Sequence, residues 1–332
     1  MEWSQRIVLA LFLTAITAVY FFAGVVVVGA IYRRIKHRTV AASSLRRVMR
    51  VVVLVLAGIG IGCMVYGYFI EPRWLETTHV KLTSSKLPPG SRPIRIVHIS
   101  DLHCERQERL EGRLVEVIRQ LEPDGIVFTG DALNPHGDVA NFRRCMKRLA
   151  EIAPTFAVEG NLDIRWRGPS LYEGTGVRLL DGKVEEVTVG PAETTLRFVG
   201  GPMRGWRLVE RILEKLAPGV FTVVLYHDPD FVEAAARHQP DLYLAGHTHG
   251  GQVALPGYGA LVTFSKLGKT YESGLYRVAE TYMYVNRGIG MEGGLAPPVR
   301  FWARPEVTLI EISPADSEAQ QALGAASAPT SR

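Results

Sequence analysis

The sequence predicts an α/β domain, in which helices pack outside a sandwich of sheets, behind two membrane-spanning helices. Between Ile94 and Gln252, short β-branched runs alternate with amphipathic helical patterns, and the remaining runs are mainly strands. Near the N-terminus, two long stretches carry no charged residue. A chain of 332 residues has room for one substantial domain or two small ones.

The first membrane-spanning helix is predicted over residues 7–31, "IVLALFLTAITAVYFFAGVVVVGAI", which are uncharged and long enough to cross a bilayer. A second uncharged stretch, residues 51–70, is close to the minimum length for a crossing. The alternative is a signal peptide followed by a buried helix. The length of the first stretch and the presence of the second argue against it. Residues 1–70 are therefore expected to form a multi-pass membrane anchor.

The segment from Tyr32 to Arg50 holds seven basic residues and no acidic residue. Short basic loops stay in the cytoplasm, so the part after residue 70 is predicted on the periplasmic side. "LRRVMR" before the second apolar stretch loosely resembles a twin-arginine export signal and predicts the same side. A cytoplasmic domain on a monotopic anchor is the alternative. Outside this segment 31 basic residues face 33 acidic ones, so no nucleic-acid partner is expected.

The remaining chain divides into three parts. Residues 71–92 are predicted to be a linker, because they close in "KLPPGSRP", where prolines prevent a continued helix. Residues 93–313 are expected to form the folded domain. Residues 314–332 are rich in Ala, Ser, Gln and Pro and are predicted to be disordered.

Within the domain, apolar β-rich runs predict strands and 3.6-residue periodicity predicts helices. The first half is expected to alternate strands with helices, over residues 94–100, 110–121, 125–131, 139–152 and 155–163. The second half is expected to begin with a hairpin around "GPAE" (residues 185–200) and to continue with helices over 206–216 and 230–238. Strands are expected to end in "YHDP" and "GHTHGGQ", and the last two runs, "GLYRVAETYMYVNRG" and "VRFWARPEVTLIEI", are expected to be antiparallel.

Five of these strands end in short loops that carry side chains able to bind metal. The residues are Asp101 and His103, Asp131, Asn161 and Asp163, His227 and Asp228, and His247 and His249. Such loops converge at the carboxyl ends of the strands, so the side chains are expected to meet. Imidazole, carboxylate and amide ligands suit Mn²⁺, Fe²⁺ or Zn²⁺. The number of groups predicts two divalent ions that share a bridging carboxylate.

One residue separates Asp101 from His103, and one separates His247 from His249. In an extended backbone residues i and i+2 point the same way, so each pair is predicted to face one side. Glycines beside the second pair are expected to allow close approach and unusual backbone angles. One histidine alone is commonly a packed core or loop residue, so the prediction rests on the joint pattern.

The order "DLH … GD … GN-x-D … H … GHTH" resembles the calcineurin-like metallophosphoesterase family. "GHTHGGQ", "VNRGIG" and "VRFWARPEV" resemble its bacterial branch with membrane-anchored or exported members. The resemblance covers about residues 93–312 and implies a four-layer αββα sandwich. It also implies two metal ions, one held by Asp101, His103 and His249 and the other by Asn161, His227 and His247, with Asp131 bridging. A water between the ions would lose its proton near neutral pH and attack phosphorus in line.

The sequence departs from the family at Leu162, where the family usually has histidine. That histidine lies beside the phosphate and is thought to stabilise charge or protonate the leaving oxygen, and leucine does neither. Three consequences are open: substrates whose leaving group needs no proton, a substitute acid such as His136, or a catalytically weak protein. Arg287 in "NRGIG" is a candidate phosphate ligand, and a surface arginine is the alternative.

The predicted function is a membrane-anchored phosphohydrolase that attacks phosphodiester or pyrophosphate bonds, in a lipid-linked or membrane-proximal substrate. The family includes hydrolases that split the pyrophosphate of UDP-2,3-diacylglucosamine in lipid A synthesis. That alternative requires a cytoplasmic domain and conflicts with the orientation predicted from charge. A non-catalytic metal-binding membrane sensor is the other alternative, and the presence of all seven inferred ligands argues against it.

Overall fold

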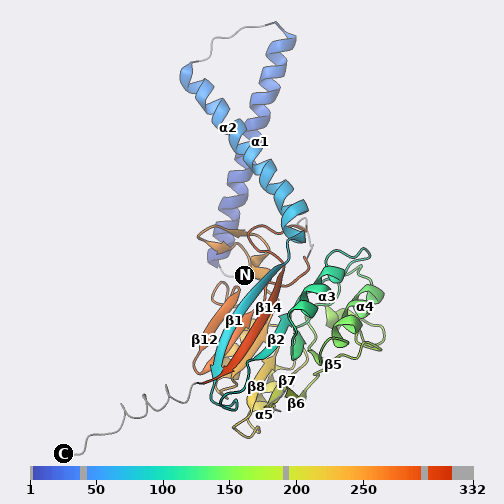
Figure 1. Ribbon diagram of the computed structural model, residues 1–332. Coiled ribbons are helices and arrows are strands. Elements are labelled where there is room, and N and C mark those ends of the chain that lie inside the picture. Colours follow the sequence, from blue (N-terminus) through green and yellow to red (C-terminus); the bar gives the residue numbers. More distant parts are fainter. Residues whose placement is uncertain (1–2, 38–42, 190–193, 293–297, 316–332) are drawn as a thin grey trace, which may run out of the picture.

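The computed structural model describes residues 3–37, 43–189, 194–292 and 298–315. Two six-stranded sheets form the centre of the domain (Figure 1). The first sheet has the order β1 (Glu76–Ser84), β14 (Glu306–Pro314), β2 (Ile94–Ile99), β3 (Gly125–Phe128), β4 (Thr155–Ala157), β5 (Arg178–Leu179). The second has the order β12 (Gly274–Val278), β13 (Thr281–Val285), β9 (Leu242–Ala245), β8 (Phe221–Leu225), β7 (Thr194–Gly200), β6 (Lys183–Val189).

The sheets pack face to face, and helices cover their outer faces. The inner apolar cluster takes side chains from both sheets, for example Ile96 and Val127 from the first and Val223 and Leu244 from the second. The alternate residues of the first sheet pack against α3 (Glu111–Gln120) and α4 (Val139–Ala150). The second sheet packs in the same way against α5 (Trp206–Leu213) and α6 (Val232–Ala236). The predicted α/β fold class is therefore confirmed, and its layers have the order αββα.

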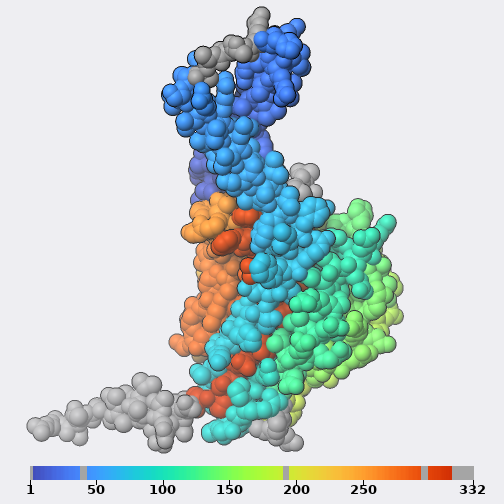
Figure 2. All heavy atoms as spheres, turned by 45° about the horizontal axis from the view of Figure 1, so that its top comes forward, coloured from blue at the N-terminus to red at the C-terminus, as the bar shows by residue number. Residues whose placement is uncertain are grey.

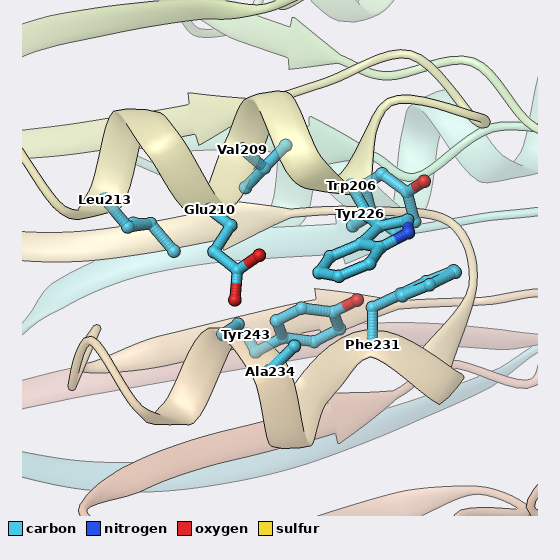
Figure 3. A pocket seen from close by; sticks show the side chains of 9 residues that line it. Trp206, Val209, Glu210, Leu213, Tyr226, Phe231, Ala234 and Tyr243 are labelled. Carbon is cyan, nitrogen blue, oxygen red and sulfur yellow. The ribbon is translucent and has the colours of Figure 1, made fainter.

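A small apolar cavity lies between α5 and α6 (Figure 3). Trp206 stacks on Phe231 with ring centroids 5.4 Å apart, and Tyr226 meets Phe231 edge-on. The remaining volume is about 10 Å³, which is room for one water at most. The cavity is therefore a packing defect of the outer layer and is too small to bind a ligand.

The linker predicted over residues 71–92 is wrong for residues 76–84, which form the edge strand β1. β1 pairs in parallel with β14 over its whole length, from Glu76 opposite Glu306 to Ser84 opposite Pro314. Its inward side chains alternate, with Val80, Leu82 and Ser84 buried, so the segment has a core face. The folded domain thus begins at β1, and only the proline-rich stretch after it is a connection.

The other predicted elements have outcomes of two kinds. The strands and helices of the first half are confirmed, with ends shifted by a few residues. The run "GLYRVAETYMYVNRG" forms two antiparallel strands, β12 and β13, and β14 of the last run lies in the other sheet, antiparallel to β2. β6 and β7 pair as the predicted hairpin, although its "GPAE" turn lies outside the described residues. The last predicted strand is shorter than expected, because residues 298–305 are not part of β14. Of the predicted disordered tail only residues 314 and 315 are described, and Pro314 still belongs to β14.

Two long apolar helices precede the domain, α1 (Trp3–Ile35) and α2 (Ser44–Val65). Each is long and apolar enough to cross a membrane. α2 continues through the π-helical turn η1 (Tyr66–Ile70) and the 3₁₀ turn η2 (Glu71–Arg73) to the start of β1. The start of α1 and the end of α2 lie on the domain side, and the end of α1 and the start of α2 lie at the far end (Figure 1).

Both helices are seated on domain loops by buried polar contacts. The Gln5 side chain of α1 is fully buried and donates to Thr263 Oγ1 at 3.3 Å. At the end of α2, the Gly67 carbonyl accepts from the Arg300 N–H at 2.9 Å. The buried Glu71 carboxylate then accepts from the backbone N–H groups of residues 302 and 303. Figure 2 shows the residues before β14 lying against this helix end. The two apolar helices are therefore packed on the domain as well as joined to it by the chain.

Candidate metal centre

The loops that follow β2, β3, β4, β8 and β9 bring the predicted ligands to one place. The first sheet supplies Asp101 and His103 after β2, Asp131 after β3 and Asn161 after β4. The second sheet supplies His227 after β8 and His247 and His249 after β9. These strands run parallel within each sheet, so their carboxyl ends lie at one edge.

Asp101, His103 and His249 form a buried group that could hold a metal ion. The Nε2 atoms of the two histidines lie 3.1 Å apart, and their rings are stacked. Asp101 Oδ1 lies 3.4 Å from His249 Nε2 and 3.9 Å from His103 Nε2. One carboxylate oxygen and two imidazole nitrogens therefore face a common point.

A second buried group consists of Asp101, Asp131 and His227. His227 Nε2 lies 3.5 Å from Asp131 Oδ2 and 4.0 Å from Asp101 Oδ1. The Asn161 side-chain oxygen is 3.1 Å from the same nitrogen. On the other side of the ring, His227 Nδ1 donates to the Thr129 carbonyl at 2.6 Å. This bond directs Nε2 into the centre, as in histidines that bind metal.

Asp131 lies between the two groups. Its Oδ2 is 3.9 Å from His103 Nε2 and 3.5 Å from His227 Nε2. Its Oδ1 accepts the Leu162 N–H at 2.8 Å, which holds the carboxylate in this orientation. Burial alone would raise the pKa of Asp131, but the facing His227 lowers it below its ordinary value.

His247 lies beside the second group. Its ring centroid is 5.0 Å from that of His227, and its N–H donates to the Asp101 carboxylate at 3.1 Å. The preceding Gly246 is required by space, because a Cβ there would collide with Ser100 and Asp101. The structure thus brings together all seven residues predicted as ligands.

The predicted extended backbone at the two spaced pairs is wrong. Asp101, His103, His247 and His249 have φ angles of 50°, 42°, 73° and 54°, in the left-handed region. Each pair lies just past its strand, so left-handed backbone and not strand alternation aims the side chains. Such backbone costs on the order of 1–3 kcal/mol per residue and persists only where neighbours hold it. Here the Asp101 N–H donates to the Gly130 carbonyl and the His103 N–H to that of Asp131.

The donor chemistry fits divalent cations. Buried carboxylates and imidazoles converge within 4 Å, and burial raises the pKa of Asp101. Burial would lower the pKa of His227, but the Asp131 carboxylate raises it to about 10, which marks a place that favours positive charge. His103 Nδ1 is buried and has no hydrogen-bond partner among the described residues. Nitrogen and oxygen donors in this mixture suit Mn²⁺, Fe²⁺ or Zn²⁺.

Asp163, one of the side chains predicted to be able to bind metal, bonds instead to the backbone of two neighbouring loops. Its buried carboxylate accepts three backbone N–H groups, from Gly160, Asp131 and Ala132, each at 2.8 Å. These bonds join the loops after β3 and β4. Burial and the nearby Asp131 raise the pKa of Asp163 to about 7. Asp163 therefore fixes the backbone on which Asp131 and Asn161 are carried.

Leu162 and His136 differ in their relation to the centre. Leu162 is only 8% exposed and directs its N–H to Asp131, so an apolar side chain stands next to the candidate bridge. His136 is exposed on the loop after Asp131. Among the described residues no hydrogen bond or ion pair joins His136 to the centre. Its role as a substitute acid stays a prediction.

The structure pairs Arg287, the predicted phosphate ligand, with two carboxylates. Its Nε donates to the buried Glu306 at 3.2 Å, and its Nη2 donates to Glu76 at 2.7 Å. These pairs tie β1 to the loop after β13. A phosphate would have to compete with both carboxylates for this guanidinium, and phosphate binding by Arg287 stays a prediction.

Arg300 is the arginine that reaches the centre, and sequence reasoning missed it. Its side chain is fully buried and donates to the carbonyls of Gly288, Gly290 and Ala303, among others. Its Nη2 lies 3.4 Å from His249 Nδ1. Burial, then the neighbouring His103 and Arg300, keep the pKa of His249 well below its ordinary value, so this imidazole is neutral. The one available signal was a charged residue inside the apolar run "VRFW".

Known proteins resemble this chain over most of its length. Residues 94–251 match the family model described as calcineurin-like phosphoesterase. The uncharacterized metallophosphoesterase YkuE of Bacillus subtilis (strain 168) is 31% identical, over 74% of this chain and 89% of its own. The phosphodiesterase YaeI of Escherichia coli (strain K12) is 30% identical, over 74% of this chain and 92% of its own. A transmembrane protein with metallophosphoesterase domain from Danio rerio is 26% identical, over 85% of this chain and 66% of its own.

Proposed function

Because this chain belongs to the calcineurin-like metallophosphoesterase family, and so to a family of phosphoesterase hydrolases, we propose a more specific function for it. It is a membrane-anchored, two-metal hydrolase of phosphodiester or pyrophosphate bonds in a substrate at the membrane. The apolar helices and the relatives named as transmembrane proteins indicate membrane association. The periplasmic orientation derived from the basic loop stays a prediction.

The observation that carries the two-metal proposal is the position of Asp131 between two donor groups. We assign Asp101, His103 and His249 to one ion, and Asn161, His227 and His247 to the other, with Asp131 shared. Asp101 adjoins both groups, since its carboxylate faces His249 and also accepts the backbone N–H of His247. All the residues come from loops that β-strand ends position rigidly, as a metal site requires.

Divalent ions at such a centre polarise phosphoryl oxygens and make water a nucleophile at neutral pH. The chain's own residues prepare that chemistry. Thr129 sets the tautomer and direction of His227, and Asp163 with the Leu162 N–H holds Asp131 in place. Leu162 itself offers no proton to a leaving oxygen. We therefore favour pyrophosphates and activated diesters, whose leaving groups need little protonation.

Three features support a substrate at the membrane. α1 is seated on Thr263, in the segment that follows the η5 turn (His249–Gly251), and α2 is seated on Arg300. Both segments adjoin the candidate centre, so the centre lies at the end of the domain nearest the anchor. A lipid-linked phosphate would reach it without leaving the bilayer surface. A UDP-2,3-diacylglucosamine pyrophosphatase-like activity is the alternative that a cytoplasmic domain would favour.

The first test is metal-dependent turnover by the full chain in detergent micelles. Protein stripped with a chelator is expected to be inactive, and reloading with Mn²⁺, Fe²⁺ or Zn²⁺ is expected to restore hydrolysis. Bis(p-nitrophenyl) phosphate and a pyrophosphate diester are expected to turn over at least about tenfold faster than the alkyl monoester glycerol 2-phosphate, because an alkoxide leaving group needs a proton donor and p-nitrophenolate does not. Two bound ions per chain without any turnover would leave the metal-binding sensor as the explanation.

Restoring the family's histidine at Leu162 tests the specificity argument. The Leu162→His variant is expected to gain monoesterase activity by about 10²-fold, and diesterase activity by much less, since general-acid help contributes about 10²–10⁴-fold. Steady-state kinetics on the same substrate panel measures both gains. Leu162→Met is the matched control, because it keeps an apolar side chain of similar volume and is expected to change neither. Equal gains for the two substrate classes, or no gain, would contradict the argument.

A further inference from the structure

Two exposed aromatic side chains stand where the anchor helices meet the domain. Phe264 is 69% exposed and follows Thr263, the residue that accepts the hydrogen bond from Gln5 of α1. Trp302 is 63% exposed, and its N–H donates to Glu71 at the end of α2. Each domain loop that contacts an anchor helix thus carries a large apolar side chain that the described part of the domain does not cover.

Both side chains are exposed by a backbone conformation that is unfavourable in free energy for bulky residues. Phe264 and Trp302 have φ angles of 57° and 59°, a region that bulky residues rarely adopt. Their neighbours are buried and hydrogen-bonded: Thr263 Oγ1 donates to the Gly268 carbonyl, and the Ala303 N–H donates to Glu71. These hydrogen bonds therefore fix the backbone of each loop, and the aromatic ring stays exposed to solvent.

Cationic side chains accompany these rings. Trp74, which is 49% exposed, directly follows the last turn of the anchor, and the Arg304 guanidinium lies 3.7 Å over its ring. Lys266 is exposed two residues after Phe264. Aromatic rings beside arginine and lysine at the ends of apolar helices are typical of the membrane–water interface. The combination favours a bilayer over an apolar protein partner.

The length of α1 determines how deep Phe264 lies relative to the bilayer. α1 has 33 residues, which at 1.5 Å per residue is about 50 Å, against a hydrocarbon core about 30 Å thick. The ends of α1 therefore reach the headgroup layer. Gln5 is near one such end and bonds to Thr263, so Phe264 lies at headgroup depth if α1 crosses the bilayer.

We propose that Phe264 and Trp302, with Trp74 beside them, insert into the headgroup region of a phospholipid bilayer and dock the domain on it. The docking surface continues the anchor, and it rests on the membrane anchor of the proposed function but not on its catalysis. Phe301, next to Trp302, bonds by its N–H to the Gln252 carbonyl, and Gln252 follows the η5 turn that contains His249. Docking would therefore hold the candidate metal centre against headgroup phosphates.

The test places a fluorescent probe at each position in the full chain, reconstituted in vesicles of phosphatidylcholine and phosphatidylglycerol. Single cysteines are introduced as Phe264→Cys and Trp302→Cys in a Cys63→Ser background, because Cys104 and Cys145 are buried. Each is labelled with nitrobenzoxadiazole. Val184→Cys is the matched control, since Val184 is 37% exposed on the edge strand β6, which Figure 1 shows away from the two apolar helices.

Probes at positions 264 and 302 are expected to shift to the blue and to be quenched by brominated lipids, and the probe at 184 is not. Quenching at either position no greater than at 184 overturns the proposal. This readout does not depend on hydrolysis, so it separates failure of docking from failure of the proposed function.

A second measurement uses the double variant Phe264→Ser/Trp302→Ser. Its KM for a phosphodiester embedded in the vesicles is expected to rise about tenfold or more, as lost interfacial burial of two aromatic rings predicts. Its turnover of soluble bis(p-nitrophenyl) phosphate is expected to stay unchanged. An unchanged KM for the embedded substrate would also overturn the proposal.

Discussion

Replacing Asp131 with alanine is expected to lower metal-dependent diester hydrolysis at least about 10³-fold, because metal ions supply several kcal/mol of transition-state stabilisation. The Asp131 carboxylate faces both His103 and His227, so its loss weakens both donor groups. The purified variant is also expected to bind fewer than two ions per chain. Elemental analysis of the protein measures the ions, and kcat/KM for bis(p-nitrophenyl) phosphate measures the catalytic loss.

Asp138→Ala is the matched control for this experiment. Asp138 lies seven residues further along the same loop and caps α4 by accepting the Ala140 N–H at 2.7 Å. Its loss is expected to cost about 1 kcal/mol of stability without changing the metal content. An Asp131→Ala protein that keeps two ions and more than about a tenth of the wild-type activity would refute the assignment of Asp131 as the shared ligand.

Replacing Arg300 with leucine is expected to lower the free energy of unfolding by about 3 kcal/mol, because several buried carbonyls lose their donor. For a domain of this size the unfolding midpoint falls by roughly 10 °C. Arg300 Nη2 lies beside His249 Nδ1 and helps to hold the imidazole ring, so its loss is expected to lower Mn²⁺ affinity by about 10–100-fold, as is typical when a residue that orients a metal ligand is removed. Thermal unfolding and metal titration of the full chain in detergent measure the two effects.

Arg237→Leu is the control, since Arg237 is an exposed arginine that pairs with Glu210 at 3.4 Å. Such a surface pair contributes about 0–1 kcal/mol, so neither the unfolding midpoint nor the metal affinity is expected to change measurably. Arg300→Lys retains the charge but fewer donors, and we expect intermediate values. Wild-type metal affinity in Arg300→Leu would show that Arg300 supports only the fold and does not position His249.

The sequence predicted the elements whose signal is local. The helices α3 and α4 have apolar residues at helical spacing, and β2, β3, β8 and β9 are short apolar runs with clear ends. β1 was missed because its pairing with β14 joins residues 230 positions apart, for example Glu76 and Glu306. An edge strand with polar alternate residues resembles a linker until its partner is known.

In the candidate centre too, the sequence predicted what depends on local signals and missed what depends on long-range packing. The spacing of Asp and His after strand ends predicted which loops converge, since strand direction alone brings such loops to one edge. The spacing did not predict how the side chains are aimed, because left-handed turns replaced the expected extended backbone. Nor did it distinguish Arg287 from Arg300. Both lie in glycine- or apolar-rich segments, and only packing decided that one pairs with carboxylates and the other is buried against His249.

By itself the sequence determined the fold class, the two apolar helices and the set of residues that meet at the strand ends. These properties depend on hydrophobic periodicity, the length of the apolar stretches and the order of motifs, all of which can be read from the sequence alone. Only the tertiary structure decided that Asp131 faces both donor groups, that Asp163 ties their loops together, and that the anchor is seated on Thr263 and Arg300. Those contacts join residues that are 28 or more positions apart, and 258 positions apart in one case, so they exist only once the sheets have packed.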